Sequence, residues 1–413
     1  MEKIYKVAIV GGGASGLSAA VMLSEKLGGD VIVLERTNRV GKKITVTGNG
    51  RGNLTNKNIS ADNYHAAEGD APSFVRDALS SFGAEQAEKF LKSLGLILTE
   101  ENGRVYPASF QASSALDLIR LKLACTGAEV RTDFQVTDVH MGNNAILTSQ
   151  SGERVIAENV ILAAGGMARK EFGTDGAAYS LARKAGHTIT GCSPALVQLK
   201  TDHSDIRQLK GIRQEVMLTL LDGNMPITCE KGDVLFTEFG VSGDAVFRVS
   251  SHLSKCRRPE LSIEFLPDVS EYVLAAELAQ KVQIADYLTA GDLLTGVVNK
   301  QAGRAIVARA GIDPNEKCRK SHVKPVIDVL KDFRLQVLGT LGFQYAQVTR
   351  GGIRLREIDS HTMRSKFNKN LYFAGEIMDI DGDCGGYNLH WAFATAYAIS
   401  REIGAFYGKE IEI

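Results

Sequence analysis

A glycine-rich turn near the N-terminus limits the fold of this chain more than any other feature. Residues 4–10 (IYKVAIV) have the apolar pattern of a buried strand, residues 14–27 that of a helix, and residues 31–35 (VIVLE) that of a second strand. Between the first strand and the helix, the sequence G-G-G-A-S-G fits the G-x-G-x-x-G pattern of a dinucleotide-binding βαβ unit. The chain is therefore predicted to contain a Rossmann-type α/β domain.

Each glycine of this turn has a separate predicted task. Gly11 permits the tight turn, Gly13 lets the backbone approach a pyrophosphate, and Gly16 lets helix and strand pack closely. The start of the helix offers unbonded N–H groups to the phosphates, and Glu35 is placed to accept a hydrogen bond from a ribose hydroxyl. The alternative is a glycine-rich turn that binds nothing. Predicted contacts of the nucleotide half are Gly11, Gly13, Ala14, Ser15, Gly16, Glu35, Arg36, Val136, Ala164 and Gly165.

A polar, glycine-rich loop follows the second strand and favours FAD over NAD as the expected ligand. Residues 41–56 contain four glycines, two lysines, one arginine and three asparagines. Such a loop suits a long cofactor with a ribityl chain and a second ring system, whereas a plain NAD domain continues into another strand and helix. The alternative is a mobile surface loop. Predicted contacts here are Lys43, Gly48, Asn49, Gly50, Arg51 and Asn53.

The C-terminal region contains a second helix that begins directly after glycines. Gly375-Glu376 closes a predicted strand, which places a carboxylate near a ribityl hydroxyl, and Gly385-Gly386 opens an apolar helix whose positive end faces the flavin. The three aspartates of this loop lack the spacing of an EF-hand, so no metal site is predicted. Predicted contacts are Gly375, Glu376, Asp381, Gly385, Gly386, Tyr387 and Asn388.

The pattern of the middle of the chain differs from that of both ends. Short alternations follow Pro194, and residues 271–338 have helical periodicity. Other expected elements are helices at 71–94, 113–124 and 388–402, and strands at 129–139, 145–149, 155–162 and 343–349. Predicted domains are a first FAD-binding part at 1–193, a β-rich insert at 194–268, a helical insert at 269–336 and a second FAD-binding part at 337–413.

Composition excludes several classes of protein. The 413 residues carry 48 Lys plus Arg and 48 Asp plus Glu, and the run from Lys317 to Lys324 is more typical of a solvated surface than of a nucleic-acid site. No apolar run approaches the roughly 20 residues that a membrane helix needs, and the N-terminus lacks a signal-peptide core. None of the six cysteines forms a C-x-x-C pair. We predict a cytoplasmic protein with a small-molecule substrate and no nucleic-acid or membrane partner.

Together these motifs resemble the FAD-dependent oxidoreductase family that includes 3-dehydro-bile acid Δ4,6-reductase and aminoacetone oxidase. The matching stretches are GGGASGLSAA (11–20), GKKITVTGNGRGNLTN (41–56), FTEFGVSGDAVFRVS (236–250), VTRGGI (348–353) and LYFAGEIMDIDGDCGGYNLHWAFATAYAI (371–399). The resemblance implies a bipartite FAD domain with an inserted β-barrel and a small helical domain. It agrees with the change of pattern after Pro194.

The chain departs from the family pattern at particular positions. The family's G-R-C-N reads Gly50-Arg51-Gly52-Asn53 here, so a thiol role at residue 52 is absent, and Glu238 and Asp244 stand where the family usually has His and Pro. The fold also resembles that of fumarate reductase flavoproteins, of which the covalently flavinylated members carry a His in the early loop. Residues 41–56 contain no His, which predicts non-covalent FAD.

Two redox reactions and one non-redox role are consistent with these features. The first is reduction of a C=C bond conjugated to a ketone, with NADH or NADPH as a transient electron donor and Tyr387, Arg51 or His390 as candidate catalytic groups. The second is oxidation of an amine by oxygen. The third is a flavin-bearing binding module, for example in RNA modification, which the zero net charge disfavours. Cys384 lies beside the predicted flavin but has no cysteine partner nearby in the sequence.

Overall fold

The computed structural model describes residues 3–202 and 206–413, which divide into two compact units. Unit 1 comprises Met1–Pro194 and Gln347–Ile413, and unit 2 comprises Ala195–Ala346. The chain thus leaves unit 1 after Pro194, builds unit 2 and returns to unit 1 at Gln347. Within the described residues, no helix has the length and apolar character needed to span a bilayer.

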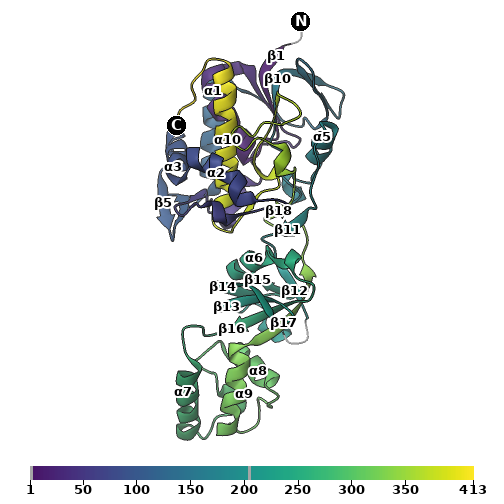
Figure 1. The fold of residues 1–413 in the computed structure, drawn as a ribbon. Coiled ribbons are helices and arrows are strands. Elements are labelled where there is room, and N and C mark those ends of the chain that lie inside the picture. Colours follow the sequence, from purple (N-terminus) through teal and green to yellow (C-terminus); the bar gives the residue numbers. More distant parts are fainter. Residues whose placement is uncertain (1–2, 203–205) are drawn as a thin grey trace. The chain divides into compact units, whose positions relative to one another are not determined.

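Unit 1 is built on a sheet whose central strands are parallel (Figure 1). The strand order is β7-β2-β1-β10-β9-β8, and β19 also pairs with β10. Ile9 of β1 lies between Val33 of β2 and Ile161 of β10, and all three side chains are fully buried, as expected for parallel strands covered on both faces. The strands are β1 Ile4–Val10, β2 Val31–Leu34, β7 Glu129–Arg131, β8 Val136–His140, β9 Ala145–Ser149, β10 Arg154–Leu162 and β19 Leu371–Phe373.

Two helices from opposite ends of the chain pack against each other in unit 1. They are α1 (Ala14–Leu27) and α10 (Tyr387–Phe406), which run side by side in Figure 1. Small buried residues such as Ala19, Ala20 and Ala394 line them, and small side chains let helix backbones come close. The other helices of the unit are α2 Ala71–Ser81, α3 Ala84–Ser93, α4 Ala112–Thr126 and α5 Ala178–Lys184.

Short strand pairs tie the loops of unit 1 together. The three-stranded sheet has the order β3-β6-β5, and β4 pairs with β20. These strands are β3 Thr55–Asn56, β4 Tyr64–His65, β5 Leu98–Glu101, β6 Arg104–Pro107 and β20 Asp381–Gly382, with β11 Ser193–Ala195 and β18 Val348–Arg350 where the chain passes between the units.

Unit 2 is a closed barrel with helices inserted between its strands, and barrel and helices share one apolar core. The barrel order is β12-β15-β14-β13-β16-β17, which confirms the predicted α/β fold with an inserted barrel. Its strands are β12 Leu199–Thr201, β13 Arg213–Asp222, β14 Met225–Phe236, β15 Gly240–Ser242, β16 Pro259–Glu264 and β17 Phe333–Thr340. Its helices are α6 Asp244–Ser250, α7 Glu271–Ile284, α8 Lys300–Arg309 and α9 Val323–Lys331.

Several predicted elements differ from those observed. The helix expected at 71–94 is interrupted at Phe82 and Gly83, where Gly83 is the N-cap of α3 and Phe82 is fully buried. The helix expected to reach residue 338 ends at Lys331, because β17 is needed to close the barrel between β12 and β16. The strand expected at 129–139 is split into β7 and β8.

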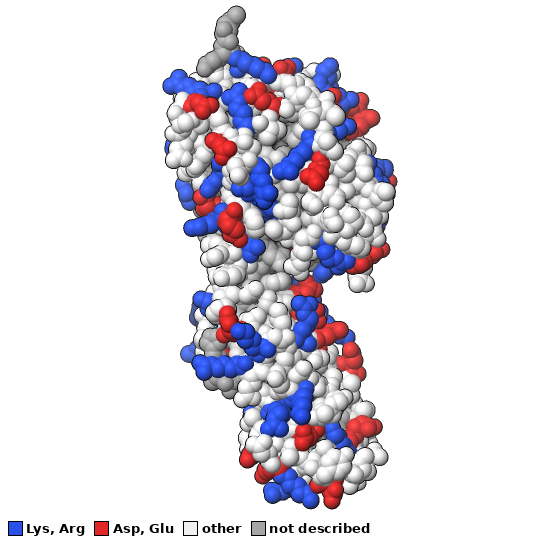
Figure 2. Space-filling model, turned by 180° about the vertical axis from the view of Figure 1, so that it is seen from behind, with Lys and Arg blue, Asp and Glu red and all other residues white. Residues whose placement is uncertain are grey.

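Acidic and basic side chains are interspersed over the face shown in Figure 2.

Candidate functional site

The glycine turn after β1 forms the tight junction that its sequence predicted. Gly11 has φ 109°, and a Cβ atom there would lie 2.6 Å from the Ala163 carbonyl oxygen, in the loop that follows β10. A Cβ at Gly16 would lie 2.0 Å from the Gly11 oxygen, so only glycine permits this contact between turn and helix. Ala164 thereby lies against the turn, and Gly165 follows it in the left-handed region with φ 70°.

The first turn of α1 has the features of an anion site. No side chain caps this helix, whose N-cap is Gly13, so the N–H groups of Ala14 and Ser15 are not bonded by a cap. A Cβ at Gly13 would meet nothing within 4 Å, which leaves the backbone open to a close ligand. The Ser15 hydroxyl donates to the Ala374 carbonyl at 3.3 Å, which ties this helix start to the C-terminal segment.

Glu35 lies beside this turn, at the end of β2. Its carboxylate accepts hydrogen bonds from the Gly12 and Thr37 N–H groups, both at 2.8 Å, and its residue is 8% exposed. The Phe134 N–H donates to the Glu35 carbonyl oxygen at 2.9 Å, which brings the start of β8, and with it Val136, to the same edge. Arg36 forms an ion pair with Asp175 at 2.5 Å. These predicted nucleotide contacts therefore occupy one edge of the sheet.

The loop after residue 41 winds through left-handed backbone. Gly48, Asn49 and Gly50 have φ values of 55°, 56° and 84°, and Gly52 has φ 78°. Between them, the Arg51 guanidinium lies over the rings of Tyr106 and Phe110, 4.3–4.7 Å from their centroids, and bonds Glu101 at 2.6 Å. The hairpin of β5 and β6 thus holds Arg51, and this placement favours a role in shaping the loop over a role in chemistry.

Lys43 and Glu376 meet across the site although 333 positions separate them. The Lys43 Nζ lies 2.8 Å from one Glu376 oxygen, and the other oxygen accepts the Thr349 N–H at 2.9 Å. Gly375 precedes this carboxylate with φ 72°, and a Cβ there would lie 2.8 Å from the Ser15 Oγ. The early loop, the C-terminal strand and the first turn of α1 therefore converge.

The start of α10 closes the same site. Gly386 has φ 100°, and a Cβ there would lie 2.6 Å from the Thr55 oxygen and 2.8 Å from the Asn53 Oδ1. The Gly385 carbonyl accepts from the Asn56 side chain at 2.8 Å. Tyr387 begins the helix, is 9% exposed, and its carbonyl accepts from the Tyr64 hydroxyl at 3.1 Å. The Asn388 amide exchanges two 2.8 Å bonds with the Gly382 backbone, so it braces the loop.

A buried acceptor at this junction tests whether a cofactor fits. Asn53 is 9% exposed, and among the described residues its Oδ1 has no hydrogen-bond partner. A buried polar atom without a partner is costly, and a ligand hydroxyl or N–H supplies one. Together with the open Gly13 backbone and the uncapped helix start, this acceptor fits FAD held along the three segments. Among the described residues no cluster of His, Cys, Asp or Glu has the arrangement of a metal site.

His390 is a core residue rather than a group exposed to the site. It is fully buried, with Nδ1 2.8 Å from the Thr55 hydroxyl and Nε2 2.9 Å from the Phe82 carbonyl. Since a carbonyl only accepts, Nε2 carries the proton and Nδ1 accepts from Thr55. Burial lowers the pKa of His390 to about 4. This geometry does not favour His390 as a proton donor near neutral pH.

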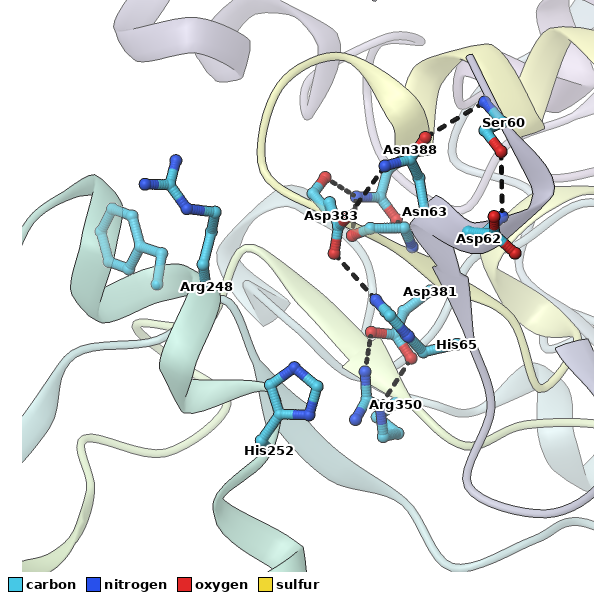
Figure 3. Close-up of polar contacts among 12 residues, drawn as sticks. Ser60, Asp62, Asn63, His65, Arg248, His252, Arg350, Asp381, Asp383 and Asn388 are labelled. Atoms are coloured by element: carbon cyan, nitrogen blue, oxygen red, sulfur yellow. Dashed lines mark hydrogen bonds and ion pairs between the residues drawn. The ribbon is translucent and has the colours of Figure 1, made fainter. Parts of the chain in front are cut away.

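Sequence reasoning missed a set of polar pairs beside the loop that opens α10 (Figure 3). Asp381, which was predicted to bind the cofactor, forms a two-bond pair with Arg350, at 2.8 Å for each bond. Burial raises the pKa of Asp381, and Arg350 opposes this effect. His65 Nε2 lies 2.8 Å from Asp383 Oδ1. Only the alternation of Asp379, Asp381 and Asp383 signalled that one side of this segment is polar.

Comparison with known proteins gives likenesses over almost the whole chain. The family described as HI0933-like protein Rossmann domain matches residues 5–402. The chain is 34% identical over 404 residues to 3-dehydro-bile acid delta(4,6)-reductase of Clostridium scindens, covering 96% of this chain and 98% of that protein. It is 28% identical over 418 residues to ribosomal RNA dihydrouridine synthase of Haemophilus influenzae, covering 98% and 99%. A solved 3-ketosteroid delta1-dehydrogenase from Sterolibacterium denitrificans has 12% identity and a TM-score of 0.49, covering 98% of this chain and 100% of that one.

Proposed function

Since the chain belongs to the HI0933-like Rossmann family and is an FAD-dependent oxidoreductase, we propose that it reduces a C=C bond conjugated to a carbonyl group. The observation that carries this proposal is the 34% identity to a delta(4,6)-reductase over nearly the full length of both chains. The substrate class that follows is a 3-oxo steroid or bile acid with unsaturation next to the ketone. We also retain as a proposal the domain limits predicted from the sequence, which are 1–193, 194–268, 269–336 and 337–413.

The proposed electron source is NADH or NADPH, bound transiently. Only one dinucleotide fingerprint occurs in the sequence, and FAD is expected to occupy it. When bound, FAD supplies the hydride acceptor and donor that such a reduction needs. The protein's own part is to hold the cofactor non-covalently through the α1 start, Glu35, the 48–53 loop and the α10 start, and to protonate the substrate.

A second candidate substrate is uridine in RNA. The 28% identity to a ribosomal RNA dihydrouridine synthase also spans almost the whole chain. Dihydrouridine differs from uridine by saturation of a C=C bond conjugated to a ring carbonyl, so both candidates require the same type of chemistry. The zero net charge favours the small-molecule substrate, because RNA binding rests largely on phosphate neutralisation.

Anaerobic half-reactions separate these candidates. Purified enzyme is first mixed with NADH or NADPH, and flavin bleaching is followed by its visible absorbance. Reduced enzyme is then mixed with a 3-oxo-Δ4,6 bile acid, with its saturated 3-oxo analogue, or with a ribosomal RNA transcript. We expect only the unsaturated bile acid to restore flavin colour. Reoxidation by the transcript alone would favour the RNA candidate, and rapid bleaching by aminoacetone with peroxide formation in air would overturn the reductase.

A further inference from the structure

Reduction of a conjugated double bond needs an acid, and this requirement rests on the proposed function. The carbon nearer the carbonyl receives a proton after the farther carbon receives hydride. His390 is excluded by its burial and by its two occupied nitrogens. The Arg51 guanidinium is held by Glu101 and lies over the rings of Tyr106 and Phe110, which gives it a role in shaping the loop. Tyr387, 9% exposed, remains at the α10 start, and a further candidate acid lies in β4, the strand that pairs with β20.

His65 has the chemistry and the partner of such an acid. Its side chain is 25% exposed, and its Nε2 lies 2.8 Å from the Asp383 carboxylate, whose other oxygen accepts from the Asn63 side chain at 3.1 Å. A carboxylate that accepts from one ring nitrogen holds the imidazole in one orientation.

The backbone connects this pair to the cofactor cradle. Strand β4 pairs with β20, so that Asp381 lies opposite His65, and the Asp383 N–H donates to the Asn63 carbonyl at 2.9 Å. Asp383 is three positions before Gly386, where an added Cβ would lie 2.6 Å from the Thr55 oxygen and 2.8 Å from Asn53 Oδ1 of the early loop. Asp379 connects the segment before β20 to the segment after β4, because its carboxylate accepts from the Ala67 and Glu68 N–H groups at 2.7 and 3.0 Å.

We propose that His65, oriented by Asp383, is the acid that protonates the carbon next to the substrate carbonyl. The substrate gains one hydride at the far carbon and one proton from the imidazolium at the near carbon, so the C=C bond becomes a single bond. The two electrons come from the nicotinamide donor through the bound cofactor, and neutral His65 regains its proton from solvent. Figure 3 shows the His65–Asp383 pair next to the Asp381–Arg350 pair, whose Asp381 lies opposite His65 in the β4–β20 ladder.

The test uses full-length holoenzyme reduced with dithionite, so that the nicotinamide step is bypassed. His65→Gln, His65→Ala and Asp383→Asn are compared with wild type in flavin reoxidation by the 3-oxo-Δ4,6 bile acid and, separately, by ferricyanide, which accepts electrons without a proton. We expect His65→Gln to slow reoxidation by the unsaturated ketone by about 10²–10⁴-fold. Ferricyanide reoxidation and the dissociation constant for FAD are expected to change by less than about threefold.

Matched variants distinguish an acid from a structural residue. His140→Gln, on the exposed end of β8, is the control that should behave as wild type. Added imidazole is expected to restore part of the ketone reaction in His65→Ala, a rescue that a folding defect would not show. If the unsaturated ketone reoxidises the flavin of His65→Gln as fast as that of wild type, the role of His65 is overturned, but the proposed function is not. Wild-type enzyme that reduces neither the C=C bond of the unsaturated ketone nor that of uridine would remove the proposed function and this role with it.

Discussion

Replacing Gly386 by alanine tests whether the start of α10 is built as tightly as its geometry indicates. The residue has φ 100°, and the added Cβ would lie 2.6 Å from the Thr55 oxygen and 2.8 Å from Asn53 Oδ1. The first contact is with backbone, which cannot rotate away as a flexible side chain would. Left-handed backbone costs a non-glycine residue roughly 1–2 kcal/mol and overpacking about 1–3 kcal/mol, so Gly386→Ala is expected to destabilise unit 1 by about 2–5 kcal/mol.

Two matched glycines separate the two costs. Gly152 has φ 88° with nothing within 4 Å of a Cβ, so Gly152→Ala carries the backbone strain alone, about 1–2 kcal/mol. Gly191 has neither a positive φ nor a neighbour within 4 Å, so Gly191→Ala should stay within about 0.5 kcal/mol of wild type.

Urea unfolding of the FAD-free chain measures these differences. The single tryptophan of the chain, Trp391, is 2% exposed in α10 and reports on unit 1 by its fluorescence. The expected order of unfolding midpoints is Gly191→Ala, then Gly152→Ala, then Gly386→Ala as the lowest. Coincident midpoints for Gly386→Ala and Gly191→Ala would refute the reasoning that the helix start is closed by backbone contact.

Three further outcomes are expected. The pKa of His390 is about 4 in the folded chain and 6.5 in an ordinary histidine, so between these pH values the unfolded chain binds a proton that the folded chain does not bind. The free energy of unfolding should therefore fall by about 3 kcal/mol as the pH drops from 6.5 to 4. Urea titrations at each pH should show a smaller pH dependence for His390→Gln than for wild type. Asn53→Ala should weaken FAD binding about 10-fold in calorimetric titration of FAD-free protein, since its Oδ1 has no partner among the described residues; unchanged affinity would place the cofactor elsewhere. Arg51→Lys retains charge but loses the fork and the stacking on Tyr106 and Phe110, so FAD affinity measured by flavin fluorescence should fall about fivefold, while Arg207→Lys, in unit 2, should not change it.

Much of unit 1 could be predicted because its signals are local. The alternation of strand, glycine turn and helix is a short-range pattern, and α1 begins at Ala14 and ends at Leu27 as its sequence indicated. Some glycines indicate a backbone conformation that other residues rarely adopt, or a close contact that a Cβ atom would prevent. Those at 11, 16, 385 and 386 are of this kind. Such constraints belong to single residues, and they are therefore visible without knowledge of the fold.

The roles of charged and polar side chains depended on partners far away in the chain. Arg51 pairs with Glu101 and lies over two aromatic rings, and Asp381 pairs with Arg350. His65 was not a candidate in the sequence, because its partner Asp383 lies 318 positions later. Residue type limits which bonds such a group can make, but the choice among partners is made only when distant strands are brought together.

The sequence by itself therefore determined that this chain builds a dinucleotide-binding α/β unit with two glycine-opened helices and an insertion between them. Tertiary structure alone decided where the insertion's last strand lies, because residues 333–340 follow a long helical pattern and become β17 only by pairing with β12 and β16. The physical reason is common to both cases: φ angles and apolar periodicity act within a few residues, whereas strand pairing, ion pairing and burial act between residues that only folding makes neighbours.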